Sequence, residues 1–492
     1  MSVSPSSIFR HEIFRSPVLA SVCRLARETN RDVYLVGGFL RDFLTGRKKP
    51  SLDLDFAVDL DAIGFARSLA KKCRAGFVVL DKERGCCRLV WKEKSGRVLT
   101  FDFVDFRGQN LEEDLRRRDF TINTLALRLP LEEKKILDYC GGLKDLKAGI
   151  IRRVAKDSFD DDPLRILRAY SLAAIFGFKI EPATARLARQ KREQLKTVAG
   201  ERLRDEMFKI FSSEDSFSVI RKLDKDKVLE YVIPQIRVMH NVKQGGYHHL
   251  DVWGHSLETL RKLEDQMRRM ERDRDVRIYL EEPLSSNRTR RQLMKLAALL
   301  HDIGKPQAHE IKAGKTMFHG HERIGRVISD TVSERLKLST RERYALDTII
   351  FWHLRPGYLA DNETLTPRAI HRFFRDTKDE AVSVLLISIA DQRATRGPLA
   401  TVESRRRHER VSFSLIGEYF RMLKEKPFVR LIDGNDLICK LKLKPGPVFS
   451  VVLNAVEDAQ VEGKIKTRPQ ALALAAKVSR QKGGAVLSGG RS

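Results

Sequence analysis

The sequence is poor in cysteine and has no long apolar run. Six cysteines occur among 492 residues, and none forms a Cys-x-x-Cys pair, which is typical of a protein kept in a reducing cytosol. Because no run of eighteen apolar residues is present, we expect no transmembrane helix and no membrane partner. The first residues also lack a basic stretch followed by a long apolar core, so no secretory signal is expected. These absences predict a cytoplasmic protein.

Acidic and aromatic residues are also scarce. Lys and Arg number 93 against 66 Asp and Glu, which gives a formal net charge of +27, and aromatic residues make up 8% of the chain. An excess of positive charge this large favours a polyanionic partner. Because few aromatic side chains are available for stacking on bases, a folded RNA held by its phosphates is the expected partner. The length predicts three or four domains.

Two aspartates, Asp53 and Asp55, carry the most specific chemical signal. They lie in the stretch 52–58, Leu-Asp-Leu-Asp-Phe-Ala-Val, whose alternation with period two predicts a strand. Residues i and i+2 of a strand point to the same side, so both carboxylates share one face. Two neighbouring carboxylates repel each other unless a cation lies between them, and oxygen ligands of this kind suit Mg²⁺.

A glycine turn precedes this strand. Residues 32–36 are predicted to form a strand that ends in Gly37 and Gly38, with a helix beginning near Leu40. Glycines at such a turn let backbone N–H groups approach a phosphate, and the helix N-terminus favours the anion. Taken alone, the glycine pair fits an ordinary turn, and the aspartate pair fits a solvated strand edge. Together they predict metal-assisted attack on a nucleoside triphosphate.

Four ordered sequence blocks resemble a known family. The first combines the Gly-Gly turn and Arg41-Asp42 with Asp53 and Asp55, and the second is Arg-Arg-Asp-Phe-Thr-Ile-Asn at 117–123. The third runs from 138 to 152, and the fourth is Asp-Asp-Pro-Leu-Arg-x-x-Arg at 161–168. In this order they resemble the nucleotidyltransferase head of bacterial tRNA nucleotidyltransferases and poly(A) polymerases. The resemblance implies transfer of nucleotides from CTP or ATP to the 3′-end of tRNA.

The resemblance also implies roles for individual residues. Mg²⁺ would be held by Asp53 and Asp55, and Asp102 occupies the place of a third catalytic carboxylate, while Asp105 points to the opposite face of its strand. Asp162 and Arg165, expected on one helix face, would read the base, although an ordinary ion pair between them is the alternative. The residues implied to bind the nucleotide are Gly37, Gly38, Arg41, Arg118, Asp119, Asn123, Asp162, Arg165 and Arg168.

The sequence departs from this family in three places. Asp161 replaces a glutamate of the fourth block, and Ser171 stands where many relatives carry a further arginine that helps to hold the triphosphate. The flexible loop that separates the third-carboxylate strand from the second block in CCA-adding relatives is missing around residues 108–115. In the family a shortened loop is associated with the addition of two C residues alone. CC addition and full CCA addition therefore both stay open, with poly(A) synthesis as a third product.

A second group of metal-ligating residues follows in the C-terminal half. Nine of the twelve histidines fall between His240 and His353, and His301-Asp302 ends an apolar helical stretch. This pattern resembles the HD metal-dependent phosphohydrolase domain, whose imidazole and carboxylate ligands suit a transition metal such as Mn, Ni, Co or Fe. The implied ligands are His255, His301, Asp302 and Asp391, with His319, His321 and His353 placed to complete a second metal site.

The sequence therefore predicts a multidomain α+β enzyme. We expect a nucleotidyltransferase head with a small mixed sheet at 1–154, an all-α neck at 155–240, an HD-type helical body at 241–400, a helical tail at 401–480 and a disordered C-terminus at 481–492. An HD phosphohydrolase that uses the head as an RNA-binding module is the alternative from another functional class. The HD substrate and the oligomeric state are left open.

Overall fold

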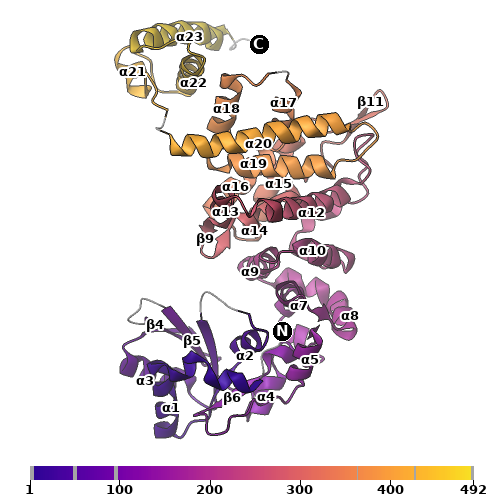
Figure 1. The fold of residues 1–492 in the computed structure, drawn as a ribbon, viewed down its shortest axis with the longest axis vertical. Coiled ribbons are helices and arrows are strands. Elements are labelled where there is room, and N and C mark those ends of the chain that lie inside the picture. Colours follow the sequence, from indigo (N-terminus) through magenta and orange to yellow (C-terminus); the bar gives the residue numbers. More distant parts are fainter. Residues whose placement is uncertain (1–4, 48–51, 93–97, 363, 426–427, 489–492) are drawn as a thin grey trace. The chain divides into compact units, whose positions relative to one another are not determined.

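The chain forms two compact units, residues 1–232 and residues 233–492, in a computed structural model (Figure 1). The structure describes residues 5–47, 52–92, 98–362, 364–425 and 428–488. The first unit contains a mixed sheet and a set of short helices, and the second is almost entirely helical. The predicted α+β fold with a small mixed sheet is confirmed. Among the described residues, no helix has both the length and the apolar character needed to cross a membrane.

The first unit is built on a six-stranded mixed sheet. Its strand order is β3-β4-β5-β2-β1-β6, and β2 and β5 run parallel while the other neighbours are antiparallel. The register of β2 on β5 places Asp55 directly beside Asp102. The strands are β1 (Val33–Val36), β2 (Leu52–Val58), β3 (Gly76–Asp81), β4 (Cys86–Lys92), β5 (Val98–Asp105) and β6 (Ala126–Leu129).

One face of this sheet carries the core of the first unit. Phe56, Phe101 and Phe103 are fully buried, and the rings of Phe56 and Phe103 stack with their centroids 4.8 Å apart. Helices α1 (Pro17–Thr29) and α3 (Ala62–Cys73) contribute to the same apolar cluster. Burial of each phenylalanine stabilises the fold by roughly 1.5–3 kcal/mol. Since alternate residues of a strand point to opposite faces, this packing turns Asp53, Asp55 and Asp102 to the other face.

Short helices complete the first unit. Helix α2 follows β1 directly, and α7 and α9 pack against each other beyond the sheet (Figure 1). Two residue pairs, β7 (Ile150–Ile151) and β8 (Lys179–Ile180), form a small parallel sheet of their own. The helices are α2 (Gly38–Leu44), α4 (Leu111–Arg116), α5 (Gly142–Ala148), α6 (Ser158–Asp161), α7 (Leu164–Phe176), α8 (Pro182–Lys191), α9 (Gly200–Phe211), α10 (Ser216–Lys225) and α11 (Leu229–Val232).

The second unit packs its helices around α19 (Ala381–Ala394). Residues 381–390 are all buried, and α12 (Val252–Met270), α14 (Arg290–Leu300) and α16 (Thr340–Trp352) contact this helix. The remaining elements are α13 (Arg274–Glu281), β9 (Pro283–Ser285), β10 (Arg288–Thr289), β11 (Glu310–Lys312), β12 (Lys315–Met317), α15 (His321–Arg335), α17 (Arg355–Asp361), α18 (Pro367–Thr377), α20 (Val402–Lys424), α21 (Gly434–Cys439), α22 (Pro447–Val461) and α23 (Arg468–Ser488).

Helices α20 and α23 lie in the predicted tail and C-terminus. Helix α20, expected in the tail, packs against α17 and α19 of the body, and His408 on it shares a hydrogen bond of 3.1 Å with Ser388. Helix α23 begins at Arg468 and continues to Ser488, and the disorder expected for 481–492 stays a prediction. Residues 489–492 lie outside the described residues.

The basic run at 288–291 is paired and not solvated. Arg290 is only 1% exposed, and it binds the buried Glu380 as well as Glu282, the latter at 2.7 Å. Its guanidinium also lies over the ring of Tyr279, 4.3 Å from the centroid. Arg288 binds the fully buried Glu342 at 2.6 Å. These arginines hold the second unit together, so they do not form a surface for RNA.

Removing Glu380 is expected to destabilise the second unit. A Glu380→Ala change leaves the charge of Arg290 buried with only Glu282 as a partner, which costs about 3–5 kcal/mol. Urea unfolding followed by the fluorescence of Trp253 and Trp352 measures the effect. As a control, Glu418→Ala removes the carboxylate that binds the exposed Arg421 and leaves the midpoint nearly unchanged. Equal midpoints for the two variants would contradict the importance of the buried network.

Candidate functional site

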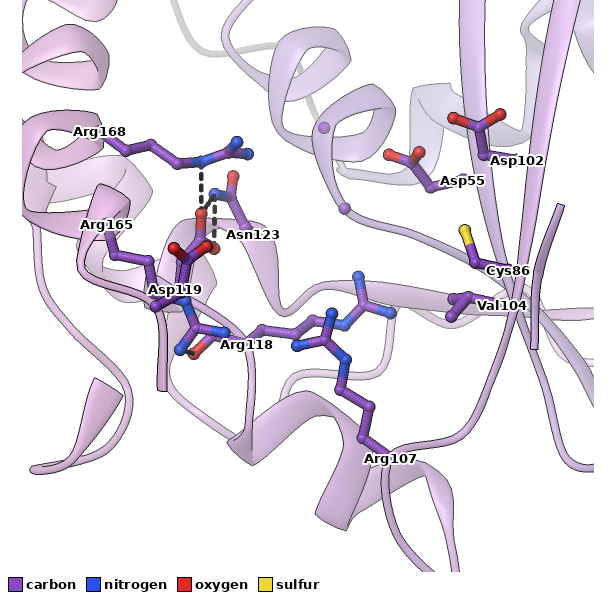
Figure 2. A pocket seen from close by; sticks show the side chains of 13 residues that line it. Asp55, Cys86, Asp102, Val104, Arg107, Arg118, Asp119, Asn123, Arg165 and Arg168 are labelled. Carbon is purple, nitrogen blue, oxygen red and sulfur yellow. Dashed lines mark hydrogen bonds and ion pairs between the residues drawn. The ribbon is translucent and has the colours of Figure 1, made fainter. Parts of the chain in front are cut away.

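A pocket of about 330 Å³ opens on the face of the sheet opposite the phenylalanine core. Figure 2 shows Asp55 and Asp102 on one side of it and the arginine side chains, together with Asp119, on the other. The lining residues come from the glycine turn, strands β2, β4 and β5, and the segments before and within α7. They are Gly37, Gly38, Asp55, Cys86, Asp102, Val104, Arg107, Arg118, Asp119, Asn123, Asp162, Arg165 and Arg168.

Three carboxylates occupy the strand face that borders the pocket. Asp55 and Asp102 lie side by side on parallel strands and line the pocket, whereas Asp53 lies two residues earlier on the same face and is exposed. Asp102 is bound by Arg88 of β4, with Nε donating over 2.7 Å and Nη2 over 2.8 Å. Asp105 faces away and accepts from the N–H of Ala62 at 2.6 Å. The oxygen-only donor set fits a hard divalent cation.

The glycine turn brings the backbone close to these carboxylates. Gly37 has a φ of 77°, a conformation that glycine adopts without steric cost. A Cβ at Gly37 would lie 3.2 Å from Asp55 Oδ2 and 3.6 Å from Arg118 Nη1. A side chain at Gly37 would crowd both groups, so glycine is what lets the backbone at the start of helix α2 lie this close to the carboxylate and the guanidinium.

A buried ionic network fixes the far side of the pocket. Arg168 Nε lies 2.7 Å from Asp119 Oδ2, and Asn123 donates to both oxygens of Asp119 at 2.9 and 3.1 Å. Although burial alone would raise the pKa of the Asp119 carboxyl, Arg168, Asn123 and the N–H of Phe120 hold it below its usual range. Asp119 therefore stays ionised and positions both neighbours.

Arg41, predicted to bind a phosphate, is not among the residues that line the pocket. Its side chain is buried, with Nε and Nη2 donating to Asp42 at 2.9 and 2.8 Å and Nη1 donating to Asn123 at 2.5 Å. It also lies over the ring of Phe176, 4.7 Å from the centroid. With its donors taken up inside the protein, Arg41 supports Asn123 from behind and does not line the site.

Asp162 and Arg165 both line the pocket but do not pair with each other. Asp162 lies before α7 in an extended conformation and not on the helix, because the residue preceding a proline, here Pro163, is disfavoured in the α region. It accepts from Arg202 at 2.7 Å. Arg165 donates instead to backbone carbonyls, including that of Arg117 at 2.9 Å. The ordinary ion pair considered as the alternative is therefore absent between these two described residues.

Arg107 lines the pocket, although the sequence motifs did not predict it as a site residue. It follows β5 directly and turns its guanidinium toward that of Arg118 (Figure 2). Asp114, which lies between the two arginines in sequence, binds Arg118 at 3.0 and 2.9 Å and accepts from the backbone N–H of Arg107 at 3.2 Å. Burial lowers the pKa of Arg107. Because residues 106–110 alone connect β5 to α4, the chain keeps Arg107 next to the pocket.

Ser171, which stands in place of a family arginine, points away from the pocket. Its side chain is 1% exposed and donates to Glu206 of α9 and not toward the lining residues. Arg168, three residues earlier, lies 3.9 Å from the same glutamate. The positive charge of the described pocket wall comes from other residues, namely Arg107, Arg118, Arg165 and Arg168.

The second unit contains a separate cluster of buried histidines and aspartates. One group consists of His255, His301 and Asp391, and a second of Asp302, His321 and His353, and within each group the ligand atoms lie within 4.8 Å of one another. Asp302 joins the groups, since its Oδ2 is 3.2 Å from His301 Nε2 and its Oδ1 is 3.3 Å from His321 Nε2. This arrangement suits two metal ions that share one carboxylate.

The histidine tautomers fit metal binding. Nδ1 of His301, His321 and His353 each donates to the carbonyl three residues earlier, at 2.9, 2.8 and 2.7 Å. The Nε2 atoms are therefore left as electron-pair donors facing the cluster, as in metal sites. Burial lowers the pKa of His255 and His353, which keeps these imidazoles neutral. Such imidazole and carboxylate donors suit a transition metal.

His319 is the exception among the predicted metal ligands. It is exposed and belongs to neither group, because it lies ahead of α15 while His321 is the first residue of that helix and turns inward. Two residues outside the predicted set border the cluster instead. Lys305 Nζ lies 2.7 Å from Asp302 Oδ2 and donates to Gln244 Oε1 at 2.7 Å.

Three family models match the chain in succession. The Poly A polymerase head domain covers residues 33–152, the probable RNA and SrmB-binding site of polymerase A covers 177–239, and the HD domain covers 252–396. The pocket residues lie within or between the first two ranges, and the histidine cluster lies inside the third. Together, fold and sites define a nucleotidyltransferase head joined to an HD body.

Full-length relatives identify the family. An A-adding tRNA nucleotidyltransferase of Deinococcus radiodurans is 33% identical over 89% of this chain and 94% of its own. A CC-adding tRNA nucleotidyltransferase of Synechocystis is 29% identical over 90% and 92%. A solved CCA-adding enzyme in complex with ATP shares the fold, with a TM-score of 0.63, 23% identity, and 98% and 97% coverage. The chain belongs to the tRNA nucleotidyltransferase and poly(A) polymerase family and carries an HD domain.

Proposed function

We propose that this chain adds nucleotides from CTP or ATP to the 3′-end of tRNA, and that it completes only one part of the terminal CCA. The observation that carries the proposal is the head pocket, in which Asp55 and Asp102 face the guanidinium groups of Arg107 and Arg118. One wall offers oxygen ligands and the other offers fixed positive charge. This pairing suits transfer of a nucleotidyl group with release of pyrophosphate.

The described residues divide the chemical tasks between them. Asp53 and Asp55 would hold Mg²⁺, which when bound supplies activation of the attacking 3′-hydroxyl and neutralises charge on the triphosphate. Arg107 and Arg118 bind the triphosphate against the glycine turn. Asp162 has acceptor oxygens for an amino group, and Arg165 has donors for ring nitrogens and carbonyl oxygens.

The same residues also explain how the nucleotide would be oriented. Asp119 and Asn123 are locked together and to Arg168, so the wall beside Arg165 has little freedom to move. Asp162 is held by Arg202, whereas Arg165 is held by backbone carbonyls, so the two side chains proposed to read the base are positioned by different partners. Selection of C or A then depends on how each presents its polar atoms to the base.

Two observations support partial addition. Residues 106–110 alone separate β5 from α4, so no flexible loop of the CCA-adding kind is present between these described elements. The Deinococcus and Synechocystis relatives, matched over 94% and 92% of their own length, carry names for one part of the reaction, A-adding and CC-adding. The short connection favours CC addition, and the relative with 33% identity favours A addition.

The test uses two tRNA substrates, one lacking CCA and one ending in CC, each with CTP and ATP. We expect extension by CC of the first substrate alone, or extension by A of the second alone. A product ending in CCA from the first substrate would contradict partial addition. A long ladder of A residues would contradict tRNA nucleotidyl transfer altogether and indicate poly(A) synthesis.

We further propose that the HD cluster is a metal-dependent phosphohydrolase site. The support is the bridging position of Asp302 between two groups of ligands, with Lys305 beside it as a cation for a phosphate. Mn, Ni, Co or Fe would suit the imidazole-rich donor set. Hydrolysis of 2′,3′-cyclic phosphates and of nucleotides, assayed with each metal added and with chelator, tests this function.

A further inference from the structure

A strongly basic groove of about 700 Å³ lies in the second unit, apart from the metal cluster. It is bordered by α12, by the start of α20 and by the segment 395–401 that joins α19 to α20. None of the six metal-ligating residues lines it. The basic side chains in its walls are Lys262, Arg269, Arg393, Arg396, Arg405 and Arg406.

The acidic side chains of the groove are already taken. Asp265 binds Arg268, which lies outside the lining. Glu409 accepts from Arg393 at 2.8 and 3.0 Å, and the hydrogen bonds of Arg393 are the main cause that lowers the pKa of Glu409. Lys262 is itself 3.5 Å from Glu258. The two acidic residues of the walls, Asp265 and Glu409, are therefore each bound to a cation, Arg268 and Arg393 respectively.

Four guanidinium groups of the groove have no carboxylate of a described residue within ion-pair distance, although the charge of Arg405 still acts on Glu409. The side chains of Arg269, Arg396, Arg405 and Arg406 make no hydrogen bond or ion pair with any residue that the structure describes. Concentrating like charges on one surface is unfavourable for the fold unless an anion binds there. By contrast, Arg288 and Arg290 of the same unit are each bound to a buried carboxylate. The groove is thus prepared for an anionic partner.

The lining indicates which kind of anion fits. No aromatic side chain lines the groove, so bases cannot stack on its walls. Four arginines spread over two helices and a connecting segment suit several phosphates in a row, because guanidinium groups bind phosphate oxygens in pairs. We propose that this groove binds the phosphate backbone of the tRNA substrate. This inference rests on the proposed tRNA substrate but on none of the residues of the head pocket.

The test compares two variants that lose the same charge. Replacing Arg269, Arg396, Arg405 and Arg406 with glutamine is expected to weaken tRNA binding about tenfold or more and to reduce the slope of log Kd against log salt by about four. The control replaces four exposed arginines that already have a carboxylate partner, which are Arg323, Arg343, Arg421 and Arg430. This control variant is expected to keep the wild-type slope of log Kd against log salt.

Kinetics separate a binding role from a general loss of structure. In the groove variant the KM for tRNA rises, while kcat and the KM for the nucleotide stay at the wild-type values. A variant with lysine at the four positions restores most of the salt slope, because the charge is kept. Binding that is displaced equally well by inorganic phosphate at low concentration would instead indicate a small-anion site.

The outcomes also distinguish this inference from the proposed function. An unchanged Kd for tRNA and an unchanged salt slope in the groove variant would overturn the phosphate-backbone assignment, even if nucleotide transfer is present. That result would favour an acidic protein as the partner of the groove. If the wild type transfers no nucleotide but the groove variant still loses tRNA binding, the groove stands and the proposed reaction fails.

Discussion

Replacing Asp55 with asparagine is expected to reduce nucleotide incorporation into tRNA by about three orders of magnitude or more. Asp55 lies beside Asp102 in the pocket, and a metal ion held there contributes several kcal/mol of transition-state stabilisation, of which each 1.4 kcal/mol is about tenfold in rate. Asparagine keeps the shape but not the charge of the ligand. tRNA binding stays nearly intact, because a carboxylate does not attract a polyanion.

The matched control for this prediction is Asp105→Asn on the neighbouring strand. Asp105 faces away from the pocket and accepts from the N–H of Ala62, a hydrogen bond that the asparagine oxygen also makes. Incorporation of labelled CTP and ATP into tRNA is measured for both variants. Equal loss in both would indicate damage to the sheet, and full activity of Asp55→Asn would contradict the assignment of the head pocket.

Removing the central pair of the HD cluster is expected to abolish metal binding in the second unit. His301 belongs to one group of ligands and Asp302 to the other, and the carboxylate of Asp302 lies close to both groups. The double change His301→Ala/Asp302→Ala is expected to lose the bound transition metal and all phosphoester hydrolysis. Nucleotide incorporation, which depends on residues of the first unit, is expected to continue.

Metal content measured by mass spectrometry gives a readout that does not depend on finding the substrate. Because both residues are buried, the isosteric Asp302→Asn change is included to separate loss of metal from loss of folding. His319→Ala is the control, since His319 is exposed and outside the cluster. Unchanged metal content in Asp302→Asn, or no hydrolysis by the wild type with any metal, would contradict an active HD site.

Local sequence patterns predicted the parts of the sites that depend on one element at a time. The period-two alternation at 52–58 is enough to place Asp53 and Asp55 on one strand face, because side chains alternate along any strand. For the second unit, it was the resemblance to the HD domain that implied His255, His301, Asp302 and Asp391 as metal ligands. The structure groups these four with His321 and His353.

Where several elements meet, the sequence was a poorer guide. Arg41 belongs to the most specific motif, yet it is drawn inward by Asp42 and Asn123. His319 shares a motif with His321 but stays in solvent. The direction of each side chain depends on which partners the tertiary structure brings within hydrogen-bond distance, and a single sequence does not record those distances.

The sequence by itself determined the family, the α+β fold class, the acidic strand face and the metal-ligand types of this protein. These follow from covalent order and from the fixed periodicities of strand and helix. Only the tertiary structure decided that Arg107 enters the pocket, that Arg290 is buried, and that residues of α12 and α20 form one basic groove. Each of these depends on segments far apart in the chain, and packing brings those segments together.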